Sequence, residues 1–301
     1  MAAVGLIFPL SNSRGDEPFS TPPKFLMASL GDSMTAASLA DTSLAAVDPS
    51  LRIQDLGSRV LIENKKTYSW ASGEKIISHY VRLKEYLTQN HVPGTLEMFN
   101  AAVPGNKAAN LPEQAKSIVD EFKRGQYTSV KYITLLMGNN DACSDVSPIG
   151  TPEAAFSEDF MKGLSKLSEI QQSERIPVLV AGLPRIADLG FPAIQNTQVL
   201  NGLSCEVVRN RLLKFCNPLT LWKTPAEYQS RNAVVVQKNQ LIQRIVEEAR
   251  VRFPNLDLHF TSAMFGVNLQ PSILAMDCFH PSAAGQAILS STLWNEQPWF
   301  K

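Results

Sequence analysis

Short apolar runs alternate with longer stretches of helical periodicity, and this alternation constrains the fold more than any other feature of the sequence. Five runs have the length and composition of strands: 24–30, 95–102, 130–137, 176–183 and 255–260. Five stretches have a helical pattern: 74–89, 111–122, 153–172, 226–253 and 282–294. Strands that alternate with helices favour a largely parallel sheet with helices on both faces. We therefore expect an α/β fold, a single three-layer domain with a five-stranded, mostly parallel sheet.

The first 23 residues differ from the rest of the chain. Residues 1–10 are apolar but lack the basic leading region and small-residue cleavage pattern of a signal peptide. Residues 11–23 are rich in Ser, Pro and charged residues, as loops are. Neither a repeat of about 20–50 residues nor a linker divides the remainder. We predict a flexible N-terminal segment over 1–23 and one domain over 24–301.

Composition excludes several classes of function. Lys+Arg and Asp+Glu number 28 each, whereas nucleic-acid-binding proteins normally carry a basic surplus or stripe. No apolar run reaches the length of about 18 residues that a membrane-spanning helix needs. The four His residues are scattered and Cys-x-x-Cys is absent, which argues against a zinc site. We expect no nucleic-acid partner, no transmembrane segment, no metal and no cofactor.

A segment between two cysteines is amphipathic. Cys205 and Cys216 have ten residues between them, a spacing that permits a local disulfide. Helical spacing predicts that the apolar side chains of this segment face inward and that the basic ones, among them Arg209, face outward. Two hypotheses remain open: a surface helix with two buried thiols, or a disulfide-tied lid whose basic residues face an anionic head group.

A serine follows the first predicted strand. In parallel sheets, ligands bind beyond the carboxyl ends of the strands, so side chains at these ends are candidates for chemistry. In Gly31-Asp32-Ser33 the glycine gives the turn backbone freedom, and the turn from strand to helix exposes the Ser33 hydroxyl. Ser33 is therefore a candidate nucleophile, and we expect Asp32 to hold the turn through side-chain-to-backbone hydrogen bonds.

Two further strand ends carry hydrogen-bond donors. Gly105, in a Pro-Gly turn after the second strand, lets the backbone approach a ligand and present its N–H. Asn140, in Gly-Asn-Asn-Asp after the third strand, carries a neutral amide suited to a developing oxyanion. Taken separately, each also fits an ordinary turn, and Asp141 is expected to hold the second one.

An acid–base pair stands near the C-terminus. In Asp277-Cys278-Phe279-His280-Pro281, the proline biases His280 away from helical geometry. The spacing lets the Asp277 carboxylate reach one imidazole nitrogen while the other faces a nucleophile, as in serine hydrolases. We expect His79, by contrast, to lie on the solvated side of its helix.

The order and identity of these blocks resemble the SGNH (GDSL-type) hydrolase family. Its markers are a Ser in Gly-Asp-Ser, a Gly, an Asn in Gly-x-Asn-Asp and a His in Asp-x-x-His, and the resemblance spans residues 25 to about 294. It implies a flavodoxin-like core, an acyl-enzyme route and no cofactor. The residues that match are Ser33, Gly105, Asn140 and His280, with Asp277; Ser33, Gly105 and Asn140 would form the oxyanion hole.

Finer phrases resemble the phospholipase-B-like branch of that family. They are Ser69-Trp70-Ala-Ser-Gly73, the Asn-x-Ala-x-x-Gly phrase that ends at Gly105, and Asp-Cys-Phe-His; Cys143 fits the same branch. The sequence departs from the usual first block at Met34 and Ala37, where Leu and Gly are more common. Cys143 and Cys278 have no clear partners: either they pair with each other or one stays free.

The resemblance implies a serine esterase or lipase acting on carboxylic esters, with a lipid acyl ester as the first expected substrate. The alternatives are an acetyl-sugar esterase, an acyltransferase, or an inactive relative that binds acyl ligands. Substrate choice should depend on the segments 37–73 and 184–228. We also expect transient contact with a membrane surface and, slightly favoured, a secreted or periplasmic location; the oligomeric state is not predicted.

Overall fold

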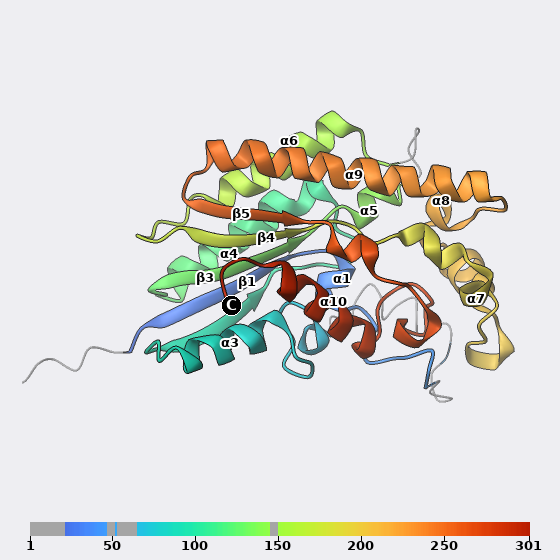
Figure 1. Cartoon of the computed structure of the whole chain (residues 1–301), viewed down its shortest axis with the longest axis horizontal. Helices are drawn as coiled ribbons and strands as arrows, with labels where there is room; N and C mark the ends of the chain where they lie inside the picture. Colours follow the sequence, from blue (N-terminus) through green and yellow to red (C-terminus); the bar gives the residue numbers. More distant parts are fainter. Residues whose placement is uncertain (1–21, 47–51, 53–64, 145–149) are drawn as a thin grey trace, which may run out of the picture.

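A computed structural model of the chain describes residues 22–46, 52, 65–144 and 150–301. Most of the predicted flexible segment, residues 1–21, lies outside this part, and β1 begins at Lys24. Five strands form one sheet in the order β2-β1-β3-β4-β5, and every neighbouring pair is parallel. The strands are β1 (Lys24–Gly31), β2 (Thr95–Asn100), β3 (Ser129–Leu136), β4 (Ile176–Ala181) and β5 (Leu256–Thr261). The predicted three-layer α/β domain is confirmed (Figure 1).

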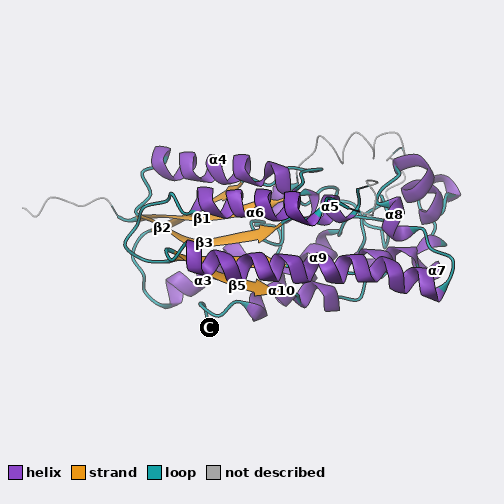
Figure 2. Cartoon of the chain, turned by 90° about the horizontal axis from the view of Figure 1, so that it is seen from above, coloured by secondary structure: helices purple, strands orange, loops and turns teal. Residues whose placement is uncertain are grey.

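Helices cover both faces of the sheet. The α-helices are α1 (Ser33–Ala36), α3 (His79–Gln89), α4 (Leu111–Arg124), α5 (Asn139–Ala142), α6 (Glu153–Leu167), α7 (Pro192–Gln195), α8 (Asn217–Thr220), α9 (Pro225–Arg252) and α10 (Ala283–Glu296). Helices α6 and α9 lie on one side of the sheet and α3 and α10 on the other (Figure 1). Seen from above, α4, α6 and α9 run side by side (Figure 2). In the part of the chain described, no helix is long and apolar enough to cross a bilayer.

Short helical turns connect these elements. The 3₁₀ turns are η1 (Lys66–Tyr68), η2 (Ala108–Asn110), η3 (Ile186–Gly190), η4 (Leu200–Gly202), η6 (Ala263–Gly266) and η7 (Pro271–Ile273), and η5 (Glu206–Leu213) is a π-helix. The strand arrows point toward α1 and α5, so the carboxyl ends of the strands meet at one edge of the sheet (Figure 1). The segment with η3, α7, η5 and α8 lies beyond that edge, where the substrate was expected.

His79 is fully buried, so its predicted solvated position is wrong. The helix expected over 74–89 begins only at His79, because the Ser78 hydroxyl accepts the N–H of Val81 and caps it there. Because the helix begins later than predicted, its inward face contains His79 and Leu83. Ile77 lies outside the helix, and its side chain is 59% exposed. His79 Nε2 is 3.2 Å from the Ser290 carbonyl oxygen in α10, so this residue joins the two helices of one layer.

Candidate active site

Ser33 is the first residue of α1, directly beyond the end of β1. Asp32 caps this helix, because its Oδ1 accepts the N–H of Met34 at 2.9 Å, as predicted. A Cβ on Gly31 would lie 2.4 Å from Thr35 Oγ1, so only glycine fits at this position. The side-chain amide of Gln114 donates to the Gly31 carbonyl at 2.8 Å and accepts its N–H at 2.9 Å. The turn that presents Ser33 is therefore fixed from both sides.

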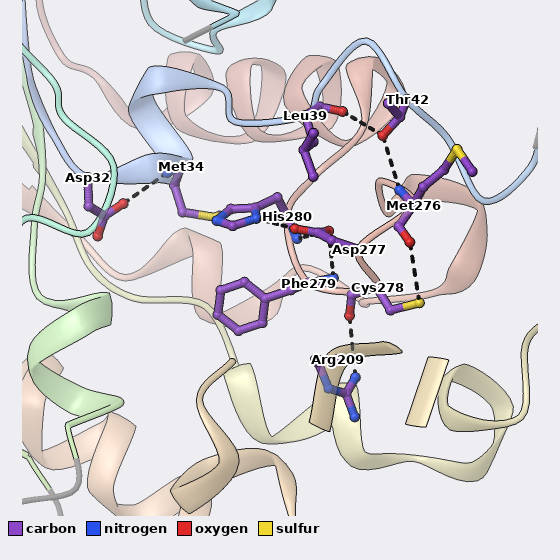
Figure 3. A network of polar contacts seen from close by, with 10 residues as sticks. All are labelled: Asp32, Met34, Leu39, Thr42, Arg209, Met276, Asp277, Cys278, Phe279 and His280. Carbon is purple, nitrogen blue, oxygen red and sulfur yellow. Dashed lines mark hydrogen bonds and ion pairs between the residues drawn. The ribbon is translucent and has the colours of Figure 1, made fainter. Parts of the chain in front are cut away.

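Asp277 and His280 form a tightly coupled pair in the loop before α10. Asp277 is fully buried, and its Oδ2 lies 2.5 Å from Nδ1 of His280. Its other oxygen, Oδ1, accepts the N–H groups of Phe279 and His280 at 3.0 Å each (Figure 3). Because a carboxylate can only accept, Nδ1 carries the ring proton in the neutral tautomer. The lone pair is then on Nε2, the nitrogen that a general base uses.

The loops that follow β2 and β3 are joined by Asn140. Its Nδ2 donates to the carbonyl oxygen of Asn106 at 2.9 Å, and the second hydrogen of the same amide remains for another acceptor. The adjacent Gly105 has a φ of +80°, and no atom lies within 4 Å of the position of a Cβ there. The loop is also tied to β1, since Val103 donates its N–H to the Gly31 carbonyl at 3.2 Å.

Asn139 was not singled out by sequence reasoning, yet it connects two of the marker blocks. Its Nδ2 donates to Oδ2 of Asp32 at 3.0 Å, so the turn of Ser33 and the turn of Asn140 are held together. Burial raises the pKa of Asp32 to about 6, and the hydrogen bonds from Met34 and Asn139 limit that rise. The sequence feature that could indicate this role is the position of Asn139 directly before Asn140. An asparagine in a turn does not by itself show which distant residue its side chain contacts.

Two of the predicted site residues, Ser33 and Asn140, line one pocket, whereas Asp277 and His280 are not among its lining residues. Ser33, Asn139 and Asn140 line it, and so do Phe279 and Pro281 on either side of His280. Gly105 is not among its lining residues. Most of the remaining lining is apolar and includes Ile186, Leu189, Leu269, Ile273, Leu274 and Leu289. Segment 184–228 therefore contributes to the pocket as expected, whereas residues 47–51 and 53–64 of segment 37–73 lie outside the described residues.

The structure contradicts both hypotheses for Cys205 and Cys216, a bond between them and two buried thiols, as well as a bond between Cys143 and Cys278. The bonds are Cys143–Cys216 and Cys205–Cys278, with Cα–Cα distances of 4.6 and 5.4 Å, and no cysteine is free. Cys205 and Cys216 lie at opposite ends of η5 and its following turn, so each meets a different loop of the site rather than the other cysteine. We call residues 205–216 the strap, because they are bonded both to the loop of Asn140 and to the loop of Asp277 and His280.

The prediction that Arg209 faces outward is also wrong, because this side chain is fully buried. The strap is a π-helix, whose hydrogen bonds run from residue i to residue i+5. Its inward residues consequently do not follow the spacing of an α-helix, and Arg209 and Val208 are inside while Leu212 is 50% exposed.

Comparison with known proteins agrees with these marker blocks. The sequence profile of the GDSL-like lipase/acylhydrolase family matches residues 27–293. The chain belongs to this family. A GDSL hydrolase of this kind is a carboxylic ester hydrolase. Within the described residues, no group of three or more His, Cys, Asp or Glu side chains could hold a metal ion.

Curated relatives confirm the finer resemblance to phospholipase B. The rat protein named "Phospholipase B1, membrane-associated" is 25% identical over 227 residues, which are 67% of this GDSL hydrolase and 14% of the rat protein. The mouse protein of the same name is 23% identical over the same shares. The chain thus spans about one seventh of the length of these relatives.

A solved structure has the same fold. It is a family two carbohydrate esterase from Clostridium thermocellum, with a TM-score of 0.50 and 12% sequence identity. The superposition covers 92% of the GDSL hydrolase and 64% of that chain. At this identity the likeness concerns the fold alone.

Proposed function

We propose that domain 24–301 is a serine hydrolase that cleaves lipid acyl esters through an acyl-enzyme on Ser33. The observation that carries the proposal is the pocket, in which Ser33 and Asn140 lie beside a largely apolar wall. Apolar side chains at this position favour a hydrocarbon chain over a sugar, because burying apolar surface contributes roughly 25 cal/mol per Å².

Acylation would begin at the Ser33 hydroxyl. His280 Nε2 takes the proton from Oγ while Oγ attacks the ester carbonyl carbon, and the C–O double bond becomes a C–O⁻ single bond. Asp277 stabilises the imidazolium that forms, because its Oδ2 already holds Nδ1–H at 2.5 Å. His280 then gives its proton to the leaving alcohol as the tetrahedral intermediate collapses to the acyl-enzyme.

The oxyanion would be bound by the N–H groups of Ser33 and Gly105 and by the Asn140 amide. One Nδ2 hydrogen of Asn140 is held by Asn106, which fixes the amide plane and directs the other hydrogen. The open space at Gly105 lets a ligand approach its backbone closely. Loss of one such donor costs about 10²–10³ in turnover. Water then releases the acyl group, again with His280 as base.

The disulfides bear on the cellular location of this reaction. Two bonds among four cysteines are typical of proteins in oxidising compartments, which supports a secreted or periplasmic location. The phospholipase B1 relatives are named as membrane-associated, and a lipid substrate would require transient contact of the site with a membrane surface.

A panel of esters from acetyl to palmitoyl tests the lipid assignment. We expect kcat/KM to rise with chain length in the wild-type protein and to vanish for every ester in Ser33→Ala. Leu269→Trp, which places a large ring at the half-buried rim of the pocket, should reduce activity on long esters more than on the acetyl ester. Val251→Trp, at a position on α9 that is 84% exposed, is the matched control and should change neither.

Each alternative gives a different outcome in this assay. A strong preference for acetyl groups would contradict the lipid assignment and favour a sugar acetylesterase. Transfer of the acyl group to an added alcohol in preference to water would favour an acyltransferase. Binding of acyl ligands without turnover would favour an inactive relative.

A further inference from the structure

One charged side chain of the strap contacts the loop that carries Asp277 and His280. Arg209, in η5, is fully buried, and its Nη1 donates to the Leu189 carbonyl at 2.7 Å and to the Cys278 carbonyl at 3.3 Å. Its Nε donates to Oδ1 of Asn210 at 3.0 Å. Cys278 stands between Asp277 and His280, and Figure 3 shows the guanidinium directed at its carbonyl oxygen. Arg209 therefore binds the main chain of the loop that carries the base.

Among the described residues, no ion pair neutralises the charge of Arg209. No carboxylate lies within ion-pair distance of it among the residues described, and its Nη2 has no hydrogen-bond partner there. Burial lowers the pKa of Arg209 to about 10, and the negative charges of Asp277 and Glu206 oppose this change. The guanidinium is therefore still positive at neutral pH. An unpaired buried cation is costly, and an apolar side chain of similar volume would often be more stable.

The loop that Arg209 contacts is held in an unfavourable backbone conformation. Cys278 has a φ of +60°, in the left-handed region that non-glycine residues seldom occupy. Such conformations persist where the surroundings over-determine them, and they concentrate at functional sites. Three contacts hold Cys278 here: the disulfide to Cys205 through its side chain, Arg209 through its carbonyl, and the Ala275 carbonyl, which accepts its N–H at 2.9 Å.

We propose that Arg209 is a positioning residue for the acid–base pair, which rests on the proposed roles of Asp277 and His280. Its hydrogen bonds fix the position of the Cys278 carbonyl relative to the main chain of Leu189, a residue that lines the pocket. The guanidinium and the Asp277 carboxylate carry opposite charges and attract each other. Glu206, from η5, also acts on Arg209, and Asp32, from the turn after β1, faces His280.

Steady-state kinetics on a short, soluble ester separate this role from a structural one, because kcat and KM are measured independently. In Arg209→Met we expect kcat to fall up to about 100-fold with KM nearly unchanged, as for a misplaced catalytic group. Arg209→Lys keeps the charge but cannot span both carbonyls, so kcat should fall here too, again with KM nearly unchanged.

Arg175 supplies the matched control. It also donates to two main-chain carbonyls, those of Pro254 and Leu256, but at the opposite end of the sheet. Arg175→Met should leave kcat and KM unchanged.

The proposal is overturned if folded Arg209→Met keeps kcat within twofold of the wild type, so that any loss of activity lies in KM alone. If Arg209→Met does not fold, a wild-type kcat in Arg209→Lys overturns it equally. Failure of the proposed function is recognised separately, because Ser33→Ala and His280→Ala would then both retain wild-type activity.

Discussion

Asp277 uses both oxygens of its carboxylate within a single loop. One oxygen holds the His280 ring, and the other accepts two main-chain N–H groups that close the loop. The side chain therefore fixes the tautomer of the base and the conformation of the chain that presents it. Because the residue is fully buried, no water can replace either set of bonds.

Replacing Asp277 with Asn should separate these two tasks. The amide oxygen can still accept the two N–H groups, so we expect the fold to survive. An amide NH₂ facing the ring would instead donate to Nδ1 and place the ring proton on Nε2, which lowers turnover by up to ~10⁴. The check is kcat on a short ester, with Asp257→Asn at the exposed edge of β5 as control. Near-full activity in Asp277→Asn would reduce this residue to a turn former.

The strap is the element on which the two sides of the site depend. Both disulfides close loops of 73 residues, and these loops overlap along the chain. In the chain-entropy account, closing one such loop stabilises the fold by about 4 kcal/mol, and overlapping loops are not additive. The bond Cys205–Cys278 has the additional property that one of its cysteines lies between Asp277 and His280.

The two bonds should consequently differ in their effect on catalysis. Removing either pair by double substitution to Ala should lower the free energy of unfolding by about 4 kcal/mol, measured with denaturant. We expect kcat to fall more in Cys205→Ala with Cys278→Ala than in the matched comparison, Cys143→Ala with Cys216→Ala, because Cys278 lies between Asp277 and His280. Peptide mapping of the oxidised protein should find Cys143 linked to Cys216. A peptide that links Cys205 to Cys216 would refute this arrangement.

Across the whole molecule, a buried histidine joins the sheet to one helix layer. His79 in α3 approaches the hydroxyl of Tyr132 in β3 at 3.0 Å and packs edge-on against Trp294 of α10. Since the Ser290 carbonyl can only accept, Nε2 carries the proton and Nδ1 accepts from Tyr132. Burial lowers the pKa of His79 to about 3, so the ring is neutral in the folded protein.

This histidine should make stability depend on pH. The His79 ring takes up a proton near its ordinary pKa of 6.5 in the unfolded chain, whereas in the folded protein its pKa is about 3. Its contribution is therefore complete above about pH 6.5 and is lost as pH falls toward 3, by about 1.4 kcal/mol per pH unit. The raised pKa of Asp32 makes the free energy of unfolding change with pH in the opposite direction between pH 3.8 and about 6. Asp32 is present in both wild type and variant, so its effect cancels when the two are compared.

Denaturant titrations of wild type and His79→Gln at several pH values isolate this effect. The difference in unfolding free energy between the two should shrink steadily from pH 6.5 to pH 3. Exposed His91 provides the control, and His91→Gln should give a difference that does not vary in this way. A constant difference for His79→Gln would mean that the folded ring protonates as easily as the unfolded one.

Local chemistry explains which features could be predicted from the sequence. The strand ends at Gly31 and Gly138 and the turn of Asp277 to His280 depend on neighbouring residues, and the structure has them where they were expected. Ala37, where glycine is more usual, adopts a left-handed φ of 56°, which accounts for that preference.

Other features depended on contacts between distant segments. The cysteine pairs join residues 73 positions apart, and only the folded loops decide which of them meet. The sequence predicts the wrong face for Arg209 because the residue spacing of an α-helix does not hold in the π-helix η5. Burial of His79 followed from where its helix starts, a boundary that periodicity places only to within a few residues.

Labelling with a fluorophosphonate, followed by peptide mass spectrometry, tests the central claim that Ser33 is the nucleophile. The probe reacts with a serine only when a base and an oxyanion site activate it. We expect one adduct per chain, on the peptide that contains Ser33, with loss of ester hydrolysis in proportion to labelling. Ser33→Ala should give no adduct, and His280→Ala should react far more slowly. An adduct on another serine, or persistent hydrolysis by Ser33→Ala, would contradict the account.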